Sequence, residues 1–254
     1  YLNNKFIKKL MSKHKESNNF IPFNKPYFSG KEVKYILDCI SIGDISGNGK
    51  YTKLCHSFFE NKYNFKKCLL TNSCTTALEM AAILLDIKPG DEVIMPSYTF
   101  VSTPNAFVLR GAKIVFCDSK NDNPCIDEDL IEGLISKKTK AIVPVHYAGF
   151  SCNMEKIISI AKKHDLFVVE DAAQAIDNYY IDSDKNLIPI GTQGHLSTFS
   201  FHESKNIICG EGGMLVINDE RFIYRSEIIW EKGTDRAAFW RGEAIPLPND
   251  EATP

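Results

Sequence analysis

The sequence predicts an α/β protein with a mostly parallel sheet of seven strands and helices on both faces. From about residue 67, short apolar runs alternate with stretches of helical periodicity, which is typical of βαβ units. The runs are apolar throughout instead of alternating with polar residues, so both faces of each strand are expected to be buried. In such open sheets, ligands bind beyond the carboxyl ends of the strands.

Each apolar run is expected to form one strand. The expected strands are residues 68–70, 92–95, 113–117, 141–145, 166–170, 196–201 and 214–217. Apolar residues at helical spacing predict the helices around and between them, and Pro89-Gly90 marks the end of one of these. The expected helices are residues 32–40, 52–63, 77–86, a segment through 105–109, 127–135 with Asp127 as its N-cap, 154–163 and 220–230.

Composition narrows the class of protein. The 254 residues carry a net charge of −2 at pH 7, which gives no reason to expect nucleic acid or an anionic membrane as a partner. The eight cysteines form no C-x-x-C pair and no zinc-type cluster with histidine, so no metal site is expected. Without a signal-peptide core or a long apolar run, the sequence predicts a reduced, cytoplasmic protein.

Two residues carry the strongest chemical signal. Lys205 follows a short expected strand and lies five residues before the Gly-rich run that starts at Gly210, and Asp171 lies at the end of an earlier strand. A pyridoxal phosphate (PLP) enzyme needs a lysine that forms a Schiff base and an acid that keeps the pyridine nitrogen protonated. Either residue alone would mean little, but together and in this order they indicate a PLP site.

Small polar residues at a strand-to-helix junction suggest where a phosphate would bind. Thr71–Thr76 joins an expected strand to an expected helix, where backbone N–H groups and hydroxyls favour anions. Taken alone, the same pattern is better explained by a simple N-cap formed by Ser73 or Thr75. Ser200, five residues before Lys205, either adds a hydroxyl to the phosphate or is an ordinary strand serine.

Three further side chains are candidates with two interpretations each. Phe100 either stacks on a cofactor ring or belongs to the core, and His146 at a strand end is either structural or catalytic. Gln174, three residues after Asp171, can reach the hydroxyl of the ring if the chain turns there. Two nucleotide motifs are excluded, because 43–50 lacks P-loop spacing and 210–213 is not G-x-G-x-x-G.

Five segments together resemble the DegT/DnrJ/EryC1/StrS family of fold-type I, PLP-dependent sugar aminotransferases. The segments are 71–78 (TNSCTTAL), 89–94 (PGDEVI), 96–100 (PSYTF), 170–174 (EDAAQ) and 199–205 (FSFHESK). The resemblance extends over about residues 21–243. Within the family, it is strongest to transaminases that make dTDP-4-amino-4,6-dideoxygalactose for enterobacterial common antigen.

The resemblance implies a role for each matching residue. Lys205 would be the Schiff-base lysine and proton shuttle, Asp171 the partner of the pyridine nitrogen, Gln174 the neighbour of the ring oxygen and Phe100 the stacking aromatic. The implied phosphate ligands are Ser73, Cys74, Thr75 and Ser200. The loop 232–236 resembles one that crosses a homodimer interface to a neighbour's phosphate, although Asp235 stands where the family usually has Asn.

The implied reaction transfers an amino group from L-glutamate to a dTDP-linked 4-keto-6-deoxyhexose, giving a 4-amino sugar for a surface polysaccharide. Amination at C3 of a related sugar stays open. A sugar dehydratase of the same fold would carry His in place of Lys205, so Lys205 argues against it.

The expected domains are an unmatched extension at 1–20, a PLP-binding large domain at 21–243 and a disordered tail at 244–254. Family members continue into a C-terminal domain that covers the active site, so a fragment or truncated chain is expected. The second hypothesis is therefore a catalytically silent protein of the PLP fold. An uncovered large domain is also expected to self-associate or to be poorly soluble.

Overall fold

The computed structural model describes residues 21–243 apart from 23 and 44. The expected extension at 1–20 and tail at 244–254 lie outside the described residues. Within the described ranges, no helix is both long and apolar enough to span a bilayer.

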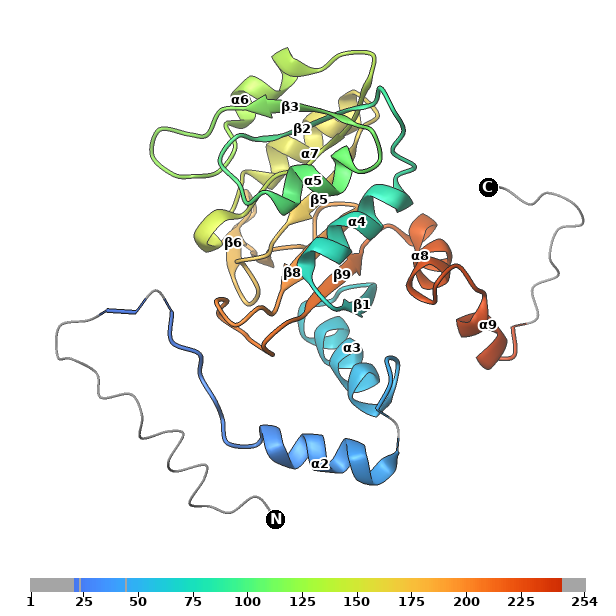
Figure 1. The fold of residues 1–254 in the computed structure, drawn as a ribbon. Coiled ribbons are helices and arrows are strands. Elements are labelled where there is room, and N and C mark those ends of the chain that lie inside the picture. Colours follow the sequence, from blue (N-terminus) through green and yellow to red (C-terminus); the bar gives the residue numbers. More distant parts are fainter. Residues whose placement is uncertain (1–20, 23, 44, 244–254) are drawn as a thin grey trace, which may run out of the picture.

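The centre of the molecule is a seven-stranded sheet in the order β1-β9-β8-β5-β4-β2-β3 (Figure 1). Its strands are β1 (Lys67–Thr71), β2 (Glu92–Pro96), β3 (Lys113–Cys117), β4 (Thr139–Ile142), β5 (Phe167–Asp171), β8 (Leu196–Ser200) and β9 (Gly213–Ile217). Only β9 runs against the others, since it pairs antiparallel with both β1 and β8. The predicted mostly parallel seven-stranded sheet is therefore confirmed.

Two details of the strands differ from the prediction. The run expected at 141–145 forms β4 at Thr139–Ile142, and beyond it Val145 makes only an isolated bridge to Asp171. Pro144 interrupts the ladder because it has no N–H to donate. A small antiparallel hairpin of β6 (Tyr179–Ile181) and β7 (Leu187–Pro189) was not expected, because each strand is only three residues long.

Every expected helix is present; the helix at 154–163 has the expected bounds, and the others have shifted ends. The helices are α2 (Glu32–Ile42), α3 (Lys50–Tyr63), α4 (Cys74–Leu84), α5 (Ser102–Val108), α6 (Glu128–Ile131), α7 (Met154–Lys163), α8 (Ile223–Trp230) and α9 (Arg236–Trp240). Short 3-10 turns are η1 (Glu132–Leu134), η2 (Tyr147–Gly149) and η3 (Glu220–Phe222). The expected helix at 127–135 is α6 followed by η1, and α9 was not expected.

Helices cover both faces of the sheet (Figure 1). Helices α4, α5 and α8 pack on one face, where Val93 and Met95 of β2 point. Ile94, between those two residues, points to the opposite face and packs with α6 and α7. Helix α3 covers the β1–β9 end of that second face, where Phe59 packs near Phe199 and Met214. The alternation places the core on both sides of each strand, as the apolar runs predicted.

Strand β1, one of the two edge strands of the sheet, has side chains bound to its outer backbone groups. The N–H of Leu70 donates to His56 Nε2 at 2.9 Å, and the indole N–H of Trp230 donates to the carbonyl of Leu70 at 2.6 Å. The N–H of Cys68 donates to the Glu60 carboxylate at 2.9 Å. Edge strands with satisfied backbone groups resist pairing with other chains.

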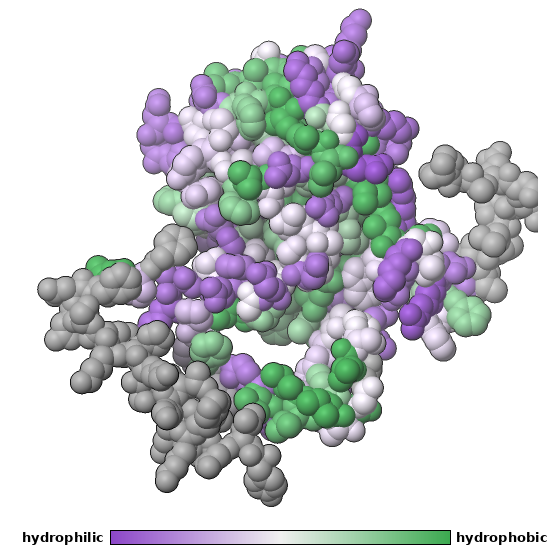
Figure 2. All heavy atoms as spheres, viewed as in Figure 1, coloured by the Kyte–Doolittle hydropathy of each residue, from purple (hydrophilic) through white to green (hydrophobic). Residues whose placement is uncertain are grey.

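Helix α2 lies apart from this body, and none of its described side chains is buried. Ile36 is 58% exposed and Ile40 62% exposed. Figure 2 shows apolar side chains over this helix. Such a helix has no core to cover within the chain described here.

Candidate active site

A cavity of about 450 Å³ opens at the carboxyl ends of the central strands. Segments that follow β1, β2, β5 and β8 line it, which is the location expected for a ligand in an open α/β sheet. Eight of the nine predicted site residues line this cavity, namely Ser73, Cys74, Thr75, Phe100, Asp171, Gln174, Ser200 and Lys205. The sheet topology thus brings together residues that are up to 132 positions apart in the sequence.

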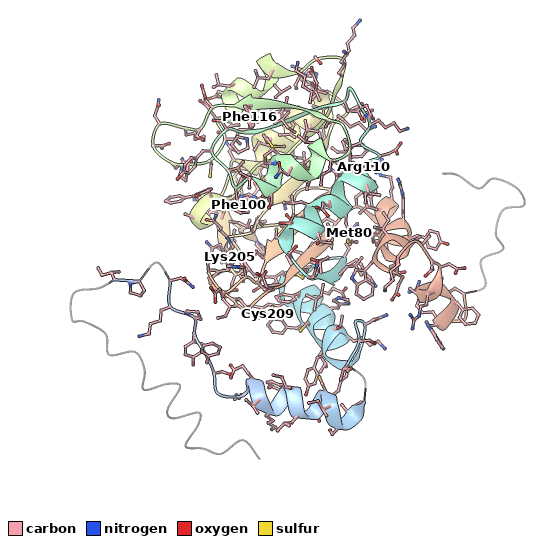
Figure 3. All side chains as sticks on the ribbon, in the orientation of Figure 1. Met80, Phe100, Arg110, Phe116, Lys205 and Cys209 are labelled. Atoms are coloured by element: carbon pink, nitrogen blue, oxygen red, sulfur yellow. The ribbon has the colours of Figure 1, made fainter. Side chains whose placement is uncertain are left out.

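Lys205 reaches the cavity from the loop between β8 and β9 (Figure 3). Its backbone is held by an N–H bond to the carbonyl of His202 at 2.9 Å. Among the described residues, none forms a hydrogen bond or an ion pair with its Nζ. The half-buried amine is therefore available for a carbonyl ligand.

Asp171 is the last residue of β5 and is 4% exposed. One carboxylate oxygen accepts from Thr103 Oγ1 at 2.6 Å, and the other accepts from the N–H of Ala173 at 3.1 Å. Burial raises the pKa of this carboxyl, and the hydrogen bond from Thr103 opposes the rise. Within the described chain no cation is bonded to it, so a buried acid faces the cavity without a charged partner.

The junction before α4 combines both interpretations offered by the sequence. Ser73 is the N-cap, since its Oγ accepts from the N–H of Thr76 at 3.1 Å. The cap explains why α4 begins at Cys74 instead of 77. The N–H groups of Cys74 and Thr75 have no partner in the part of the chain that the structure describes, and both residues line the cavity. They leave two donors at a helix N-terminus for an anion.

Three side chains near this junction, those of Cys74, Thr75 and Ser200, are compatible with an anion. Burial raises the pKa of the Cys74 thiol, so the sulfur stays neutral and does not repel a negative ligand. Thr75 Oγ1 donates to Ser102 Oγ at 2.8 Å, which ties α4 to α5 at the cavity wall. Ser200, at the end of β8, is 6% exposed and accepts from the N–H of His202 at 3.3 Å.

Gly213 allows the strand β9 to lie directly against this junction. A Cβ at this position would lie 2.3 Å from the carbonyl carbon of Ser73 and 2.4 Å from the nitrogen of Cys74. Those atoms belong to the backbone and cannot rotate away. The last glycine of the Gly-rich run therefore sets the position of the α4 N-terminus relative to the sheet.

Phe100 and Gln174 both line the cavity. Phe100 is 68% exposed, so the core role left open by the sequence is wrong. Gln174 Oε1 accepts from the N–H of Ala148 at 2.8 Å. That bond uses the amide oxygen, and the NH₂ group, which interacts with the Tyr147 hydroxyl, has a second N–H to donate.

Sequence reasoning missed the partners of two buried acids. His146 and Glu170 are both fully buried, and His146 Nε2 bonds the Glu170 carboxylate at 2.9 Å. Since His146 Nδ1 accepts from the N–H of Cys152 at 3.2 Å, Nε2 carries the proton and the histidine is a structural anchor. Burial raises the pKa of Glu170, but the bonds from His146 and from backbone N–H groups bring it below its ordinary value.

Thr103 is the other missed residue. It lies on α5, 68 positions before Asp171, and a threonine beside a helix start gives no sequence signal for such a contact. Only the strand order, which places the β2–α5 segment near the end of β5, makes the pair visible.

Asp235 does not line the cavity. It precedes α9 as its N-cap residue, with no side-chain cap bond. Its neighbours Lys232 and Arg236 line a separate, larger groove of about 860 Å³ beside β1 and α8. That groove is bigger but lacks the Lys205 and Asp171 pair, so chemistry and not size identifies the candidate active site.

Comparison with known proteins agrees with this geometry. Residues 27–245 match the DegT/DnrJ/EryC1/StrS aminotransferase family. The chain is 38% identical over 201 residues to the GDP-perosamine synthase of Escherichia coli O157:H7, which covers 79% of this chain and 54% of that protein.

Two solved structures share the fold. Spr1654 from Streptococcus pneumoniae, solved in a PLP form, superimposes with a TM-score of 0.73 at 29% identity, covering 84% of this chain and 56% of that one. DesI, solved in the presence of its TDP-sugar product, gives a TM-score of 0.77 at 26% identity, covering 86% of this chain and 54% of that one. The chain spans about half the length of the curated relatives it matches.

Proposed function

The chain belongs to the DegT/DnrJ/EryC1/StrS aminotransferase family, and we propose that it binds PLP and carries the chemical half of a sugar aminotransferase site. The observation that supports this most directly is the shared cavity of Lys205 and Asp171. The unbonded amine of Lys205 and the buried carboxylate of Asp171, which has no cation bonded to it in the described chain, line the same cavity, which is large enough for a small cofactor.

The residues present fit the cofactor. The lone carboxylate of Asp171 lacks the positive charge that a protonated pyridine nitrogen would supply. At the α4 N-terminus, the free N–H groups of Cys74 and Thr75, with the hydroxyls of Ser73 and Ser200, suit a phosphate. The exposed ring of Phe100 is placed to stack on an aromatic ligand.

Bound PLP would supply an electron sink for a carbanion next to the amino group. The chain's own residues do the rest. Lys205 Nζ, on a mobile stem, is the base that moves protons at the reacting carbon. Asp171 would hold a proton on the ring nitrogen, and the NH₂ group of Gln174 would donate to the ring oxygen.

The amino donor we propose is L-glutamate, and the acceptor is a nucleotide-linked 4-keto-6-deoxyhexose whose product enters a surface polysaccharide. The sequence resemblance favours a dTDP sugar aminated at C4. The name of the E. coli relative favours GDP instead, whereas the product bound to DesI is a TDP sugar. Amination at C3 is the alternative for the position.

We also propose a homodimer with shared active sites. No described side chain of α2 is buried, and Ile36 and Ile40 are more than half exposed, which supports an interface. In that arrangement the loop 232–236 would reach the neighbour's phosphate, and Asp235 would repel it where Asn would donate.

Absorbance tests the cofactor site. Purified protein mixed with PLP is expected to show a visible band that Lys205→Ala abolishes, because the amine forms the chromophore. Lys113→Ala changes an exposed lysine on β3 and should leave the band intact. Addition of L-glutamate should then bleach it. No Lys205-dependent band would refute the site, and a band that glutamate leaves unchanged would favour the silent protein.

Titration with free nucleotides tests which nucleotide the substrate carries. With the visible band established, fluorescence titration with dTDP and with GDP should show tighter binding of dTDP. Tighter binding of GDP would overturn the dTDP assignment in favour of the kind of substrate named for the E. coli relative.

A further inference from the structure

Two linked threonine hydroxyls, of which the inner one is buried, lead to the Asp171 carboxylate. Thr103 Oγ1 donates to Asp171 Oδ2 at 2.6 Å, and Thr103 is 1% exposed. Thr99 Oγ1 lies 2.8 Å from Thr103 Oγ1, and both threonines line the cavity. The three oxygens thus form one continuous path from the cavity wall to the end of β5.

The direction of this path follows from the proton count. An ionised carboxylate only accepts, so the single hydroxyl proton of Thr103 is committed to Asp171. The contact between the two threonines then requires Thr99 to donate to Thr103. A hydroxyl that accepts one bond while donating another is a stronger donor, so Thr99 reinforces the bond to the acid.

We propose that Thr103 is a positioning residue, which keeps the Asp171 carboxylate charged and aimed at a protonated ring nitrogen. This rests on the proposed function, because it presumes that Asp171 meets a pyridine ring. Thr103 itself touches neither substrate nor the reacting carbon; it acts through Asp171.

The charge state of Asp171 depends strongly on the hydroxyl of Thr103. His146, Lys205 and the Cys74 thiol are the ionisable groups that face Asp171 from neighbouring segments, and in the described chain none of them is bonded to its carboxylate. Burial pushes Asp171 toward its neutral form, and the bond from Thr103 is the largest opposing effect. Without that bond, a proton shared with a ring nitrogen would move toward the carboxylate.

Three variants isolate the hydroxyl. Thr103→Val keeps the shape and removes the donor, Thr103→Ser restores the donor, and Thr99→Val removes only the outer link. Ser226→Ala is the matched control, since Ser226 is fully buried and its hydroxyl bonds the Ile223 carbonyl on α8. Each protein is loaded with PLP labelled with ¹⁵N in the ring, and the ¹⁵N chemical shift reports protonation of that nitrogen.

The expected shift for Thr103→Val moves toward that of an unprotonated pyridine, with Thr103→Ser close to wild type and Thr99→Val in between. The half-reaction with L-glutamate should slow roughly tenfold or more in Thr103→Val, as expected for loss of a hydrogen bond to a charged group. Ser226→Ala should leave the shift unchanged even if its melting temperature falls.

The outcomes distinguish this inference from the proposed function. If wild type gives no Lys205-dependent band, the proposed function fails first. If wild type shows the band but Thr103→Val keeps a protonated nitrogen, the positioning role is wrong. If Thr103→Val does not fold, Thr99→Val decides, because an unchanged shift there together with an unchanged half-reaction overturns the relay.

Discussion

Gly213 shows what a missing side chain does at the residue scale. The backbone of Ser73 and Cys74 occupies the space in which its Cβ would stand. Gly213→Ala should therefore displace the α4 N-terminus, weaken PLP binding roughly tenfold or more as its bonds to a charged phosphate are strained, and cost about 1–3 kcal/mol of stability from overpacking. Visible titration with PLP and thermal unfolding measure the two effects.

Gly133 is the matched control for that change. It has a negative φ, and a Cβ added to it would meet no atom within 4 Å. Gly133→Ala should bind PLP like wild type. Equal PLP affinity in Gly213→Ala would show that the junction tolerates the shift and that its geometry is not set by β9.

Most of the candidate site could be predicted from the sequence because the type and order of its residues indicate their chemistry. Lys205 and Asp171 together, each near the end of an expected strand, indicate the chemistry, and the cluster of small polar residues before α4 is visible as a pattern. Thr103 and the pair of His146 with Glu170 could not be predicted, because each contact joins distant segments. The sequence around a threonine or a histidine does not show which distant residue it will contact in the folded chain.

At the scale of elements, β1 depends on a histidine that must stay neutral. Nε2 of His56 accepts from Leu70, so protonation would replace an acceptor with a donor. Burial, assisted by the nearby charge of Lys67, lowers the pKa of His56 from 6.5 to about 4. The unfolded chain therefore binds this proton at a higher pH than the folded chain.

The lowered pKa of His56 makes the folded chain less stable at acidic pH. Above pH 6.5 the contribution of His56 is complete, and it is lost as pH falls from 6.5 toward 4. The full loss would be about 3 kcal/mol, reduced by the partial exposure of the ring. Denaturant unfolding of wild type and His56→Gln across this range checks it, since a glutamine oxygen accepts without titrating. Parallel losses in both proteins would contradict the assignment.

Element boundaries were less predictable than element types. Helix α4 begins where Ser73 caps it, three residues before the expected start, because a cap acts through one hydrogen bond and not through periodicity. Strand β4 stops before Pro144 for a similarly local reason. The hairpin of β6 and β7 is too short for an alternation pattern to stand out.

For the whole molecule, the exposed apolar side chains of helix α2 predict self-association of this chain. Ile36 and Ile40 lie one turn apart and are both exposed, so they form one apolar stripe. Light scattering should show a dimer or larger species, and Ile36→Lys with Ile40→Lys should shift it toward monomer. Val108→Lys with Leu109→Lys, at exposed positions of the α5 end, is the control. A monodisperse wild-type monomer would contradict this expectation.

The pairing of β1 with β9 also has a consequence in time. Leu69 has its register partner at Leu215, and β1 pairs with no other strand of the sheet. A ribosome makes β1 before the other strands of the sheet, yet its partner emerges only after all of those strands. The nascent chain must therefore keep β1 and the polar junction before α4 unpaired through most of synthesis, a long-range closure that slows folding. Helix α3 is synthesised before β1, so His56 is available to bind the N–H of Leu70 during that interval.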